Sequence, residues 1–578
     1  MPPNKTSPAF PFRPALLFLR PRIVGLGALL FLGLSLRAFA GSATWNTNPG
    51  SNSWNTAKNW TPATVPNGPE DLASFNVSNI TDLILDTDID LTAMIFDPGA
   101  SAYNFTLPLG STLNFFGDGI TNDSGELQSF LLSIRKLNFY NQATAGSETL
   151  FQAGQISFYD NATAGEATFE TIASLIAFHG SSSADHGTFL NGGFDQRDHT
   201  IDGISFFDQS SAGEGYFVDN ASTRGLENNG SVYIAAGATA DTATVVNMAG
   251  TFVGALPGTM TIDGTGASGT FSALGSNVAG AAGGQILVFG NADNASYTAT
   301  GGSNGGNGGI LFFSLGAQGG TARCTVLGNA TMKMGTTDGI DLSIGSLNGD
   351  GLVFITTLGF GEKQLTVGTN NLDATFSGVI GNGIDQAASA GSLLKTGSAT
   401  FTLAGENTYT GGTVVQEGKL IVATQTGSAT GPGRVRVDAG TLGGTGVIEG
   451  RVRVGAAGTS AFLSPGITGV GMLELHKDLV FARHATYDCE IDTDQSKADV
   501  VSAKKVIIQS SAMFSLTELG TAILPIGTTF RVIEMKHLGP IVGTFANLPD
   551  RAVIAVSNRY QASYEGGDGN DLTLTVVP

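Results

Sequence analysis

Charged side chains suited to catalysis gather in one segment, FDQRDHTIDG, which begins at Phe194. Arg197, Asp198 and His199 are consecutive there. In a polysaccharide lyase or a glycoside hydrolase, an arginine can abstract a proton or neutralise charge, and carboxylates act as acid and base. Such chemistry depends on separations in space that sequence spacing does not define, and charged loops are common on acidic proteins. We therefore interpret this segment as a surface loop and keep an active site as the alternative.

Three aspartates, Asp86, Asp88 and Asp90, occupy alternate positions in LILDTDIDL. On a strand the three carboxylates share one face, and carboxylate oxygens are ligands that calcium prefers. The segment is not an EF-hand loop, because Leu91 stands where that loop needs glycine and Asp97 stands where it needs glutamate. A solvated acidic face is the favoured interpretation, and calcium is the one cofactor that remains open.

A second calcium-like segment, GGDGNDLTL, begins at Gly566 and is superficially similar to the calcium-binding nonapeptide repeat. Thr573 occupies its apolar position and the motif occurs once, whereas that fold shares each ion between neighbouring copies. We expect a turn from Gly566 to Asp571. The sequence contains no G-x-S-x-G, H-E-x-x-H, Walker, dinucleotide-binding or paired C-x-x-C motif, so no catalytic or cofactor-binding residue is predicted from a local signature.

The composition predicts a folded all-β protein. The 578 residues include 82 glycines, 41% are hydrophobic and 13% are charged, which is too apolar for a disordered chain. Abundant Gly, Thr, Ser and Asn, with few runs of helix formers, favour short strands joined by tight turns. Cys324 and Cys489 are far apart in the sequence, and we expect two buried free thiols. The net charge of −20 disfavours nucleic acid as a partner.

The first forty residues predict export. Basic residues precede an apolar run at residues 23–36, and Ala38 and Ala40 follow it before Gly41. This order is typical of a Sec signal peptide that is cleaved after Ala40, with an uncleaved anchor as the alternative. Removing residues 1–40 takes away five basic residues and no acid, so the net charge moves from −20 to −25. No later stretch is apolar enough to predict a membrane-spanning helix.

Residues from 137 to about 330 repeat one pattern. The segments LNFYNQATAG, ISFYDNATAG, IAFHGSSSAD and ISFFDQSSAG begin at Leu137, Ile156, Ile176 and Ile204, and four related segments follow. Successive starts are 19 to 28 residues apart, a period typical of solenoids. Positions one and three are apolar, which indicates a strand with one face inward. Stacked copies would align phenylalanine with phenylalanine in a parallel β-helix.

A second apolar anchor is expected near position fourteen of each repeat, after a corner that contains Ala-Gly or Ala-Asp. This anchor is predicted to be Leu150, Phe169, Phe189, Phe217 and Val245 in successive repeats. Each repeat therefore turns a corner and presents a second strand. The longer repeats add residues outside these anchors, and we expect the extra residues to form loops on one side of the solenoid.

Three tryptophans, Trp45, Trp54 and Trp60, are the only ones in the chain and lie close together near its start. Three indoles suit either a sugar-stacking platform or a cap that closes the first coil of a solenoid. We favour the cap.

The segment LLKTGSATFTLAGENTYTGGTVVQEGKLIVA from Leu393 closely resembles the autotransporter-associated β-strand repeat. The residues that carry the match are Leu403, Asn407, Tyr409, Gly411, Gly412, Thr413, Gly418 and Leu420. The resemblance implies a parallel β-helix turn in a passenger region, export, and a stalk-like or adhesin-like role without known chemistry. The last hundred residues do not offer the number of strands that a barrel translocator needs, so we expect a passenger-like chain without an evident translocator.

We predict an all-β, right-handed parallel β-helix, or β-solenoid, with an N-terminal cap and a C-terminal β-rich region. The expected divisions are a signal peptide (1–40), a Trp-rich cap with the first coils (41–136), solenoid repeats (137–390), autotransporter-associated repeat coils (391–475) and a closing region (476–578).

The expected function is that of a non-enzymatic exported protein, adhesin-like or structural, at the cell surface or outside the cell. Extracellular polysaccharide or cell-surface components are the candidate partners, and no cofactor is predicted. The alternative is a polysaccharide lyase or glycoside hydrolase on the same scaffold, with Arg197, Asp198 and His199 in its active site.

Overall fold

A computed structural model describes most of the chain from Gly41 to Pro578, which forms one compact unit. The described residues are 41–133, 135–172, 175–192, 203–223, 229–314, 316–335, 341–355, 362–383 and 390–578. None of the helices among them is long and apolar enough to cross a membrane.

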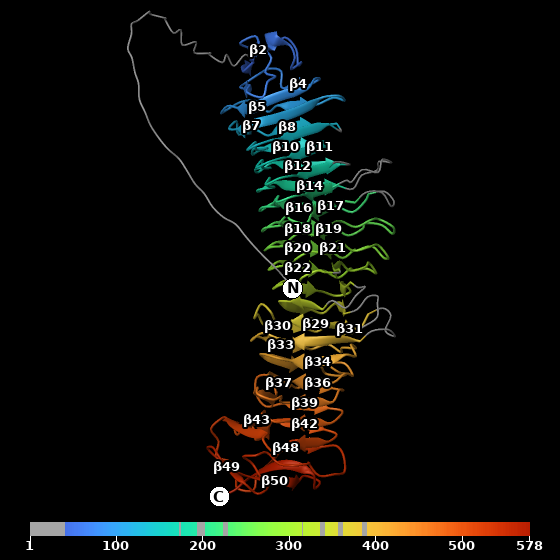
Figure 1. Ribbon diagram of the computed structural model, residues 1–578, viewed down its shortest axis with the longest axis vertical. Helices are drawn as coiled ribbons and strands as arrows, with labels where there is room; N and C mark the ends of the chain where they lie inside the picture. Colours follow the sequence, from blue (N-terminus) through green and yellow to red (C-terminus); the bar gives the residue numbers. More distant parts are fainter. Residues whose placement is uncertain are drawn as a thin grey trace, which may run out of the picture. The chain divides into compact units, whose positions relative to one another are not determined.

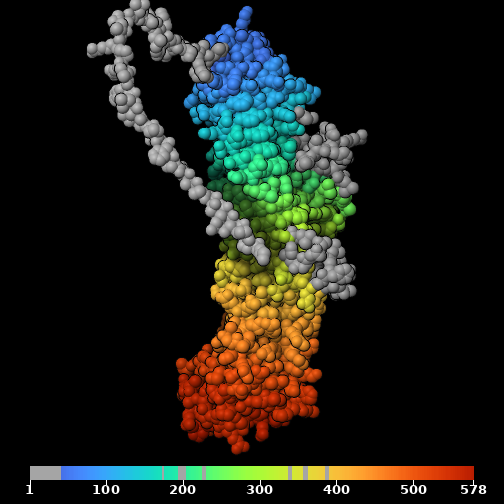
Figure 2. All heavy atoms as spheres, viewed as in Figure 1, coloured from blue at the N-terminus to red at the C-terminus, as the bar shows by residue number. Residues whose placement is uncertain are grey.

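Parallel strands in long ladders make up most of the described chain, which holds 51 strands and one short 3₁₀ helix, η1 (Ala57–Asn59). One ladder of 16 strands runs from β2 (Trp60–Thr61) to β31 (Val379–Gly381). A second ladder begins at β4 (Asp82–Ile84) and ends at β47 (Met513–Leu519). The chain passes from one ladder to the other in each coil, and the coils follow one another in sequence order (Figures 1 and 2). The fold is therefore the all-β parallel solenoid that the repeats predict.

The central coils show how the repeats build this fold. In one coil, β13 (Leu175–Phe178) belongs to the first ladder and β14 (Thr188–Gly192) to the second; in the next coil, β15 (Gly203–Phe206) and β16 (Tyr216–Asp219) take these places. The register places Phe178 beside Phe206 and Phe189 beside Phe217. Equivalent residues of successive repeats are therefore stacked, so one inward pattern repeated along the chain fills the whole core.

Two columns of phenylalanine rings run through the interior. Phe178 and Phe206 stack with ring centroids 4.6 Å apart, and Phe189 and Phe217 stack at 4.7 Å. The columns meet edge to face, with 6.1 Å between the Phe178 and Phe189 centroids. All four rings are fully buried, and burying each contributes about 1.5–3 kcal/mol. This aromatic core needs no polar partner.

The prediction for the second anchor of the first repeat is wrong by one residue. Phe151, and not Leu150, pairs with Phe169 and is buried, while Leu150 faces outward. The corner before β10 (Thr149–Gln152) has one residue more than the next corner, and Glu148 there has a φ of 50°. The extra residue shifts the inward position by one, because successive side chains on a strand point to opposite faces.

The longer repeats place their extra residues in the connections from the second ladder back to the first. The described connections of this kind are residues 248–258, 274–284 and 300–309, and they project from one side of the coils (Figure 1). This placement agrees with the expected one-sided loops.

A third ladder appears in the second half of the chain. In the earlier coils, the corners of successive coils are joined to each other only by single bridges, such as Ser183 to Ser211 and Thr265 to Asn291. From β26 (Leu342–Ile344) to β46 (Val506–Ile508) the corresponding segment forms an eight-stranded parallel sheet. Antiparallel pairing then dominates the C-terminal end, where β51 (Asp571–Val576) lies between β48 (Thr529–Met535) and β50 (Arg559–Gly566).

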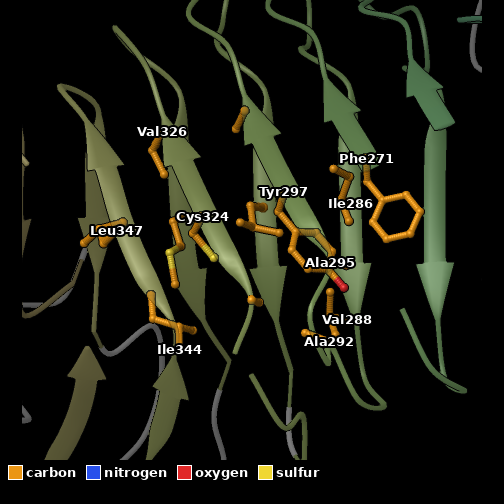
Figure 3. Packing of buried hydrophobic residues seen from close by; sticks show 14 of the residues in the cluster. Phe271, Ile286, Val288, Ala292, Ala295, Tyr297, Cys324, Val326, Ile344 and Leu347 are labelled. Atoms are coloured by element: carbon orange, nitrogen blue, oxygen red, sulfur yellow. The ribbon is translucent and has the colours of Figure 1, made fainter. Parts of the chain in front are cut away.

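The two cysteines lie in the interior as free thiols. Cys324 occupies the same inward column as Tyr297 and Leu347 and faces other apolar side chains (Figure 3). Burial raises the pKa of Cys324 to about 12, so the thiol stays protonated and unreactive at neutral pH.

A short column of polar side chains interrupts the apolar interior. Asn191, Asp219 and Asn247 face inward on three successive strands and are almost completely buried. The Asn191 amide donates to Asp219 Oδ1 at 3.0 Å, but Asp219 Oδ2 and Asn247 Oδ1 have no hydrogen-bond partner among the described residues. Burial raises the pKa of Asp219 to about 8, against the opposing effect of the Asn191 hydrogen bond. When Asp219 is protonated, its Oδ2 can donate a hydrogen bond. The neighbouring coil carries an acceptor without a partner, Asn247 Oδ1.

We predict that Asp219 makes stability depend on pH. The folded carboxyl keeps its proton up to about pH 8, whereas the unfolded carboxyl loses it near pH 3.8. Stability of the wild type should therefore fall as pH rises between these values, by at most about 1.4 kcal/mol per pH unit. Asp219→Asn should be the more stable form near pH 8, and the difference should shrink toward pH 4. Urea denaturation followed by circular dichroism at several pH values measures this.

The control for this test is Asp208→Asn, which changes an exposed aspartate and keeps an oxygen that can accept from the Gly180 amide. Parallel pH profiles for the wild type and Asp219→Asn would contradict the assignment.

A second prediction concerns the aromatic columns. Phe189→Ala should lower the free energy of unfolding by about 3–5 kcal/mol, because the ring is buried between two stacked neighbours and its removal leaves a cavity. The adjacent outward residue gives a matched control: Leu190→Ala should change stability by less than about 1 kcal/mol. Equal losses in the two variants would show that the columns do not carry the stability of these coils.

Candidate functional site

The charged segment that sequence analysis singles out for catalysis, with Arg197, Asp198 and His199, lies outside the described residues. Two histidines in the preceding coil are described. His179 stacks on Tyr159 at 5.1 Å between ring centroids. His186 is exposed, with Nδ1 2.7 Å from an Asp185 carboxylate oxygen; this hydrogen bond raises the pKa of His186. The two histidines thus have different surroundings: one lies in an aromatic row, and the other is hydrogen-bonded to an aspartate at the surface.

The three aspartates weighed as calcium ligands do not lie on one strand. β4 ends at Ile84 and β5 (Ile89–Phe96) begins at Ile89, so Asp86 and Asp88 belong to the turn between them, and only Asp90 is on a strand. The prediction of a shared strand face is therefore wrong, because the chain turns a corner there. Among the described residues no group of three or more His, Cys, Asp or Glu side chains is arranged to hold a metal ion.

Each of these aspartates instead accepts a hydrogen bond from a neighbouring coil. Asp86 accepts from the Asn55 amide, Asp88 from the Thr112 backbone N–H and Asp90 from the Asn114 amide. These contacts use the carboxylates to tie adjacent coils together.

The glycine-rich segment near the C-terminus forms the expected turn, in the hairpin between β50 and β51, where Gly566 pairs with Asp571. The Asp571 carboxylate is buried, accepts from the Met535 N–H at 2.9 Å and lies 3.3 Å from Arg531. Its role is to hold β48 against this hairpin.

The three tryptophans are packed inside the first coil. Trp45, Trp54 and Trp60 are at most 1% exposed, and each indole N–H donates to a backbone carbonyl. Their rings contact one another edge to face, and Trp54 and Trp60 also contact Phe75. Buried indoles cannot stack on a sugar, so the cap is the correct interpretation.

The coil formed by residues 391–422 uses its polar side chains to hold the backbone. Asn407 is buried; its amide donates to the Ala429 carbonyl at 2.6 Å, and its side-chain oxygen accepts from the Ile380 N–H at 2.7 Å. The Tyr409 hydroxyl is 2.6 Å from Thr413 Oγ1, and both groups are buried. These side chains thus satisfy backbone and hydroxyl groups where the coil turns a corner.

Two glycines of this coil have backbone conformations that other residues rarely adopt. Gly412 has a φ of 93° and Gly418 a φ of 67°. A Cβ atom at Gly418 would lie 2.3 Å from the Gly397 carbonyl oxygen of the coil below, so close stacking of coils also requires glycine there.

A buried lysine in the same coil was missed in the sequence analysis. Lys395 ends β32 (Gly391–Lys395) and is 1% exposed; its ammonium donates to three backbone carbonyls, those of Thr396, Gly397 and Glu417, at 2.6–3.1 Å. Burial lowers its pKa to about 8. The signal was the alternation in GSLLK, which places Lys395 on the same inward face as Leu393.

A row of half-buried aromatic rings on the outside of the solenoid was also missed. Its members are Phe116, Tyr140, Tyr159, His179 and Phe207, each directly after an inward phenylalanine. Neighbouring rings stack nearly parallel at 4.9–5.1 Å between centroids. The sequence pattern that could have predicted this row is the pair of adjacent ring-bearing residues in each repeat: FF, FY, FY, FH and FF. The stacked faces cover one another, so this row presents mainly ring edges to solvent.

A groove of about 340 Å3 opens on the solenoid surface in the coils that follow the aromatic row. Its floor is formed by small residues and its polar side chains include Asp263, Asn291 and Gln318. A second pocket of similar volume lies near the C-terminal end, between residues 467–470 and Asp492 with Lys497. Both hollows combine polar side chains with space for a small ligand.

Residues 393–422 match the model of the passenger-associated-transport repeat. One coil of the chain therefore matches this repeat. The matched residues form the coil held by Asn407, Tyr409 and Lys395. The buried polar residues of the matched segment therefore shape one turn of the solenoid.

Two curated proteins are similar to parts of this chain. An extracellular serine protease of Serratia marcescens is 32% identical over 194 residues, which are 32% of this chain and 17% of that protein. The adhesin BmaC autotransporter of Brucella suis biovar 1 (strain 1330) is 34% identical over 114 residues, 20% of this chain and 3% of that protein. The chain thus spans less than a fifth of the length of these relatives. The crystal structure of the Haemophilus influenzae Hap adhesin aligns over 88% of this chain and 64% of that chain at 14% identity and a TM-score of 0.22.

We predict that Asn407 is a structural residue of the repeat coil. Asn407→Ala leaves the Ile380 N–H and the Ala429 carbonyl without partners in a buried place, so the free energy of unfolding should fall by roughly 2–5 kcal/mol. Asn294→Ala, at an exposed asparagine, is the control and should have little effect. Thermal and urea unfolding measure both. A stable Asn407→Ala protein would show that the coil does not need the two hydrogen bonds of Asn407.

Proposed function

We propose that this passenger-like β-helix is a non-enzymatic adhesin that acts outside the cell or at the cell surface, where its outward face binds glycans. The observation that carries the proposal is that the inward and outward faces of the coils have different roles. Inward and corner side chains, such as Asn407 and Lys395, are used to hold the backbone. The outward row of rings and the groove beyond it remain at the surface.

Similarity to one curated relative supports this role. That relative is named as an adhesin and an autotransporter. The repeat that residues 393–422 match is named for its association with passenger transport. Export by the Sec pathway, which the first forty residues predict, would bring the chain to a place where an adhesin acts. Its negative charge disfavours nucleic acids and anionic lipid surfaces as ligands.

The alternative remains an enzyme that cleaves polysaccharide, with Arg197, Asp198 and His199 as the residues to replace. The other curated relative is named as an extracellular protease, and that activity belongs to that protein. Sequence analysis favours a charged surface loop at this segment.

We predict that beads coated with residues 41–578 adhere to cells or to immobilised polysaccharide, whereas beads coated with an unrelated acidic protein do not. Incubation with soluble polysaccharides in the presence of calcium should produce no new chain ends. Release of chain ends that Arg197→Ala abolishes would overturn the non-enzymatic assignment. Absence of adhesion on every surface would overturn the adhesin assignment.

A further inference from the structure

The outward row of rings is interrupted at a defined place. The register stacks Phe206, Ile234, Ile262 and Val288 in one inward column. The residue after each of these therefore occupies the outward row, which reads Phe207, Ala235, Asp263 and Phe289. Two coils thus lack the ring that the row has on either side of them.

The groove lies along the corner next to this interruption. Its floor includes Gly237, Gly264 and Gly290 on successive coils. A Cβ atom at Gly264 would lie 2.3 Å from the Ala238 carbonyl oxygen, and one at Gly290 would lie 2.2 Å from the Gly264 carbonyl oxygen. Stacking of the backbones therefore excludes side chains from the floor, so the hollow is a fixed part of these coils.

Asp263 is held in position at the edge of the groove. The Tyr233 hydroxyl donates to its Oδ2 at 2.6 Å, and the Tyr233 ring lies edge-on to Phe207 with 6.3 Å between centroids. The Phe207 ring thus supports the tyrosine, and the tyrosine orients the carboxylate. Asp263 Oδ1 accepts no hydrogen bond within the described part of the chain, and Asp263 lines the groove.

Two side-chain amides complete the polar lining. The Asn291 side-chain oxygen accepts from the Asp293 N–H at 3.0 Å, which fixes the amide plane. The nitrogen of Asn291 and the side chain of Gln318 make no hydrogen bond within the described part of the chain. The groove therefore offers amide donors and a carboxylate acceptor in a row that follows the stack of coils.

We propose that this groove binds an uncharged glycan chain that lies along the stacking direction of the coils; the proposal rests on the adhesin function proposed above. Sugar hydroxyl groups both donate and accept, so they match a groove that offers one carboxylate and two amides on three successive coils. Successive coils are about 4.8 Å apart, close to the length of one hexose unit in an extended chain. One sugar per coil can therefore meet a polar side chain on each of three successive coils.

The charges around the groove define which glycans fit. Asp263 lies in the groove, and Asp208, Asp241 and Asp293 lie at the same corner of nearby coils. A uronic acid or a sulfated sugar would be repelled there, whereas an uncharged chain would not. An extended peptide is a poorer match, because the strands beside the groove are already paired on both sides and the glycine floor has no apolar hollow for its side chains.

The test is calorimetric titration of residues 41–578 with neutral tetrasaccharides of glucose, N-acetylglucosamine and xylose, and with a tetrasaccharide of uronic acid. At least one neutral tetrasaccharide should bind, with little dependence on salt, and the acidic one should not. Gln318→Ala should weaken binding about fivefold through the loss of one hydrogen bond. Ala236→Trp, which fills the groove from an exposed position, should abolish binding.

Gln209→Ala is the matched control, since Gln209 is an exposed glutamine at the same corner of an earlier coil. It should leave affinity unchanged, and circular dichroism should show that all variants melt like the wild type. Glycan binding that survives Ala236→Trp would overturn the groove but not the adhesin function. Binding of the acidic tetrasaccharide alone, of a peptide alone, or of none of the probes would overturn this proposal, and bead adhesion would still decide the proposed function separately.

Discussion

Parallel hydrogen bonding of each coil to the next is the constraint on which the rest of the structure depends. It sets a spacing of about 4.8 Å between equivalent residues, and aromatic rings stack well at that distance. The inward columns through Phe178 and Phe189 follow from it directly. The same spacing brings backbones so close at the corners that Gly264 and Gly418 have no room for a side chain.

This constraint separates the residues that hold the fold from those available for binding. A polar group that points into the solenoid must find a partner there, as Asn407 and Lys395 do with backbone groups. Asp219 has an incomplete set of partners and retains its proton instead. Outward side chains are under no such demand. The outward row can therefore change from Phe207 to Ala235 and Asp263 without disturbing the column beneath it.

Several local features could not be obtained from spacing alone. One additional corner residue, Glu148, moves the inward anchor from Leu150 to Phe151, and only the φ of the corner reveals this. Asp86 and Asp88 alternate like strand residues but lie in a turn, because the chain leaves one ladder there and enters the other. The inward position of Lys395 could have been predicted, since strand alternation places it on the same face as Leu393. Its three carbonyl partners belong to backbone that only the folded coil brings together.

Residue types that recur at a fixed spacing were enough to predict the all-β repeat architecture and the aromatic core, and the three clustered tryptophans favoured a cap. The passenger-associated-transport repeat was also recognisable, since its motif is local. Tertiary structure decided which residues share a surface. The groove brings together Gly237, Asp263, Asn291 and Gln318 from four coils, and no local pattern predicts that neighbourhood, because residues more than twenty positions apart become neighbours only when the coils stack.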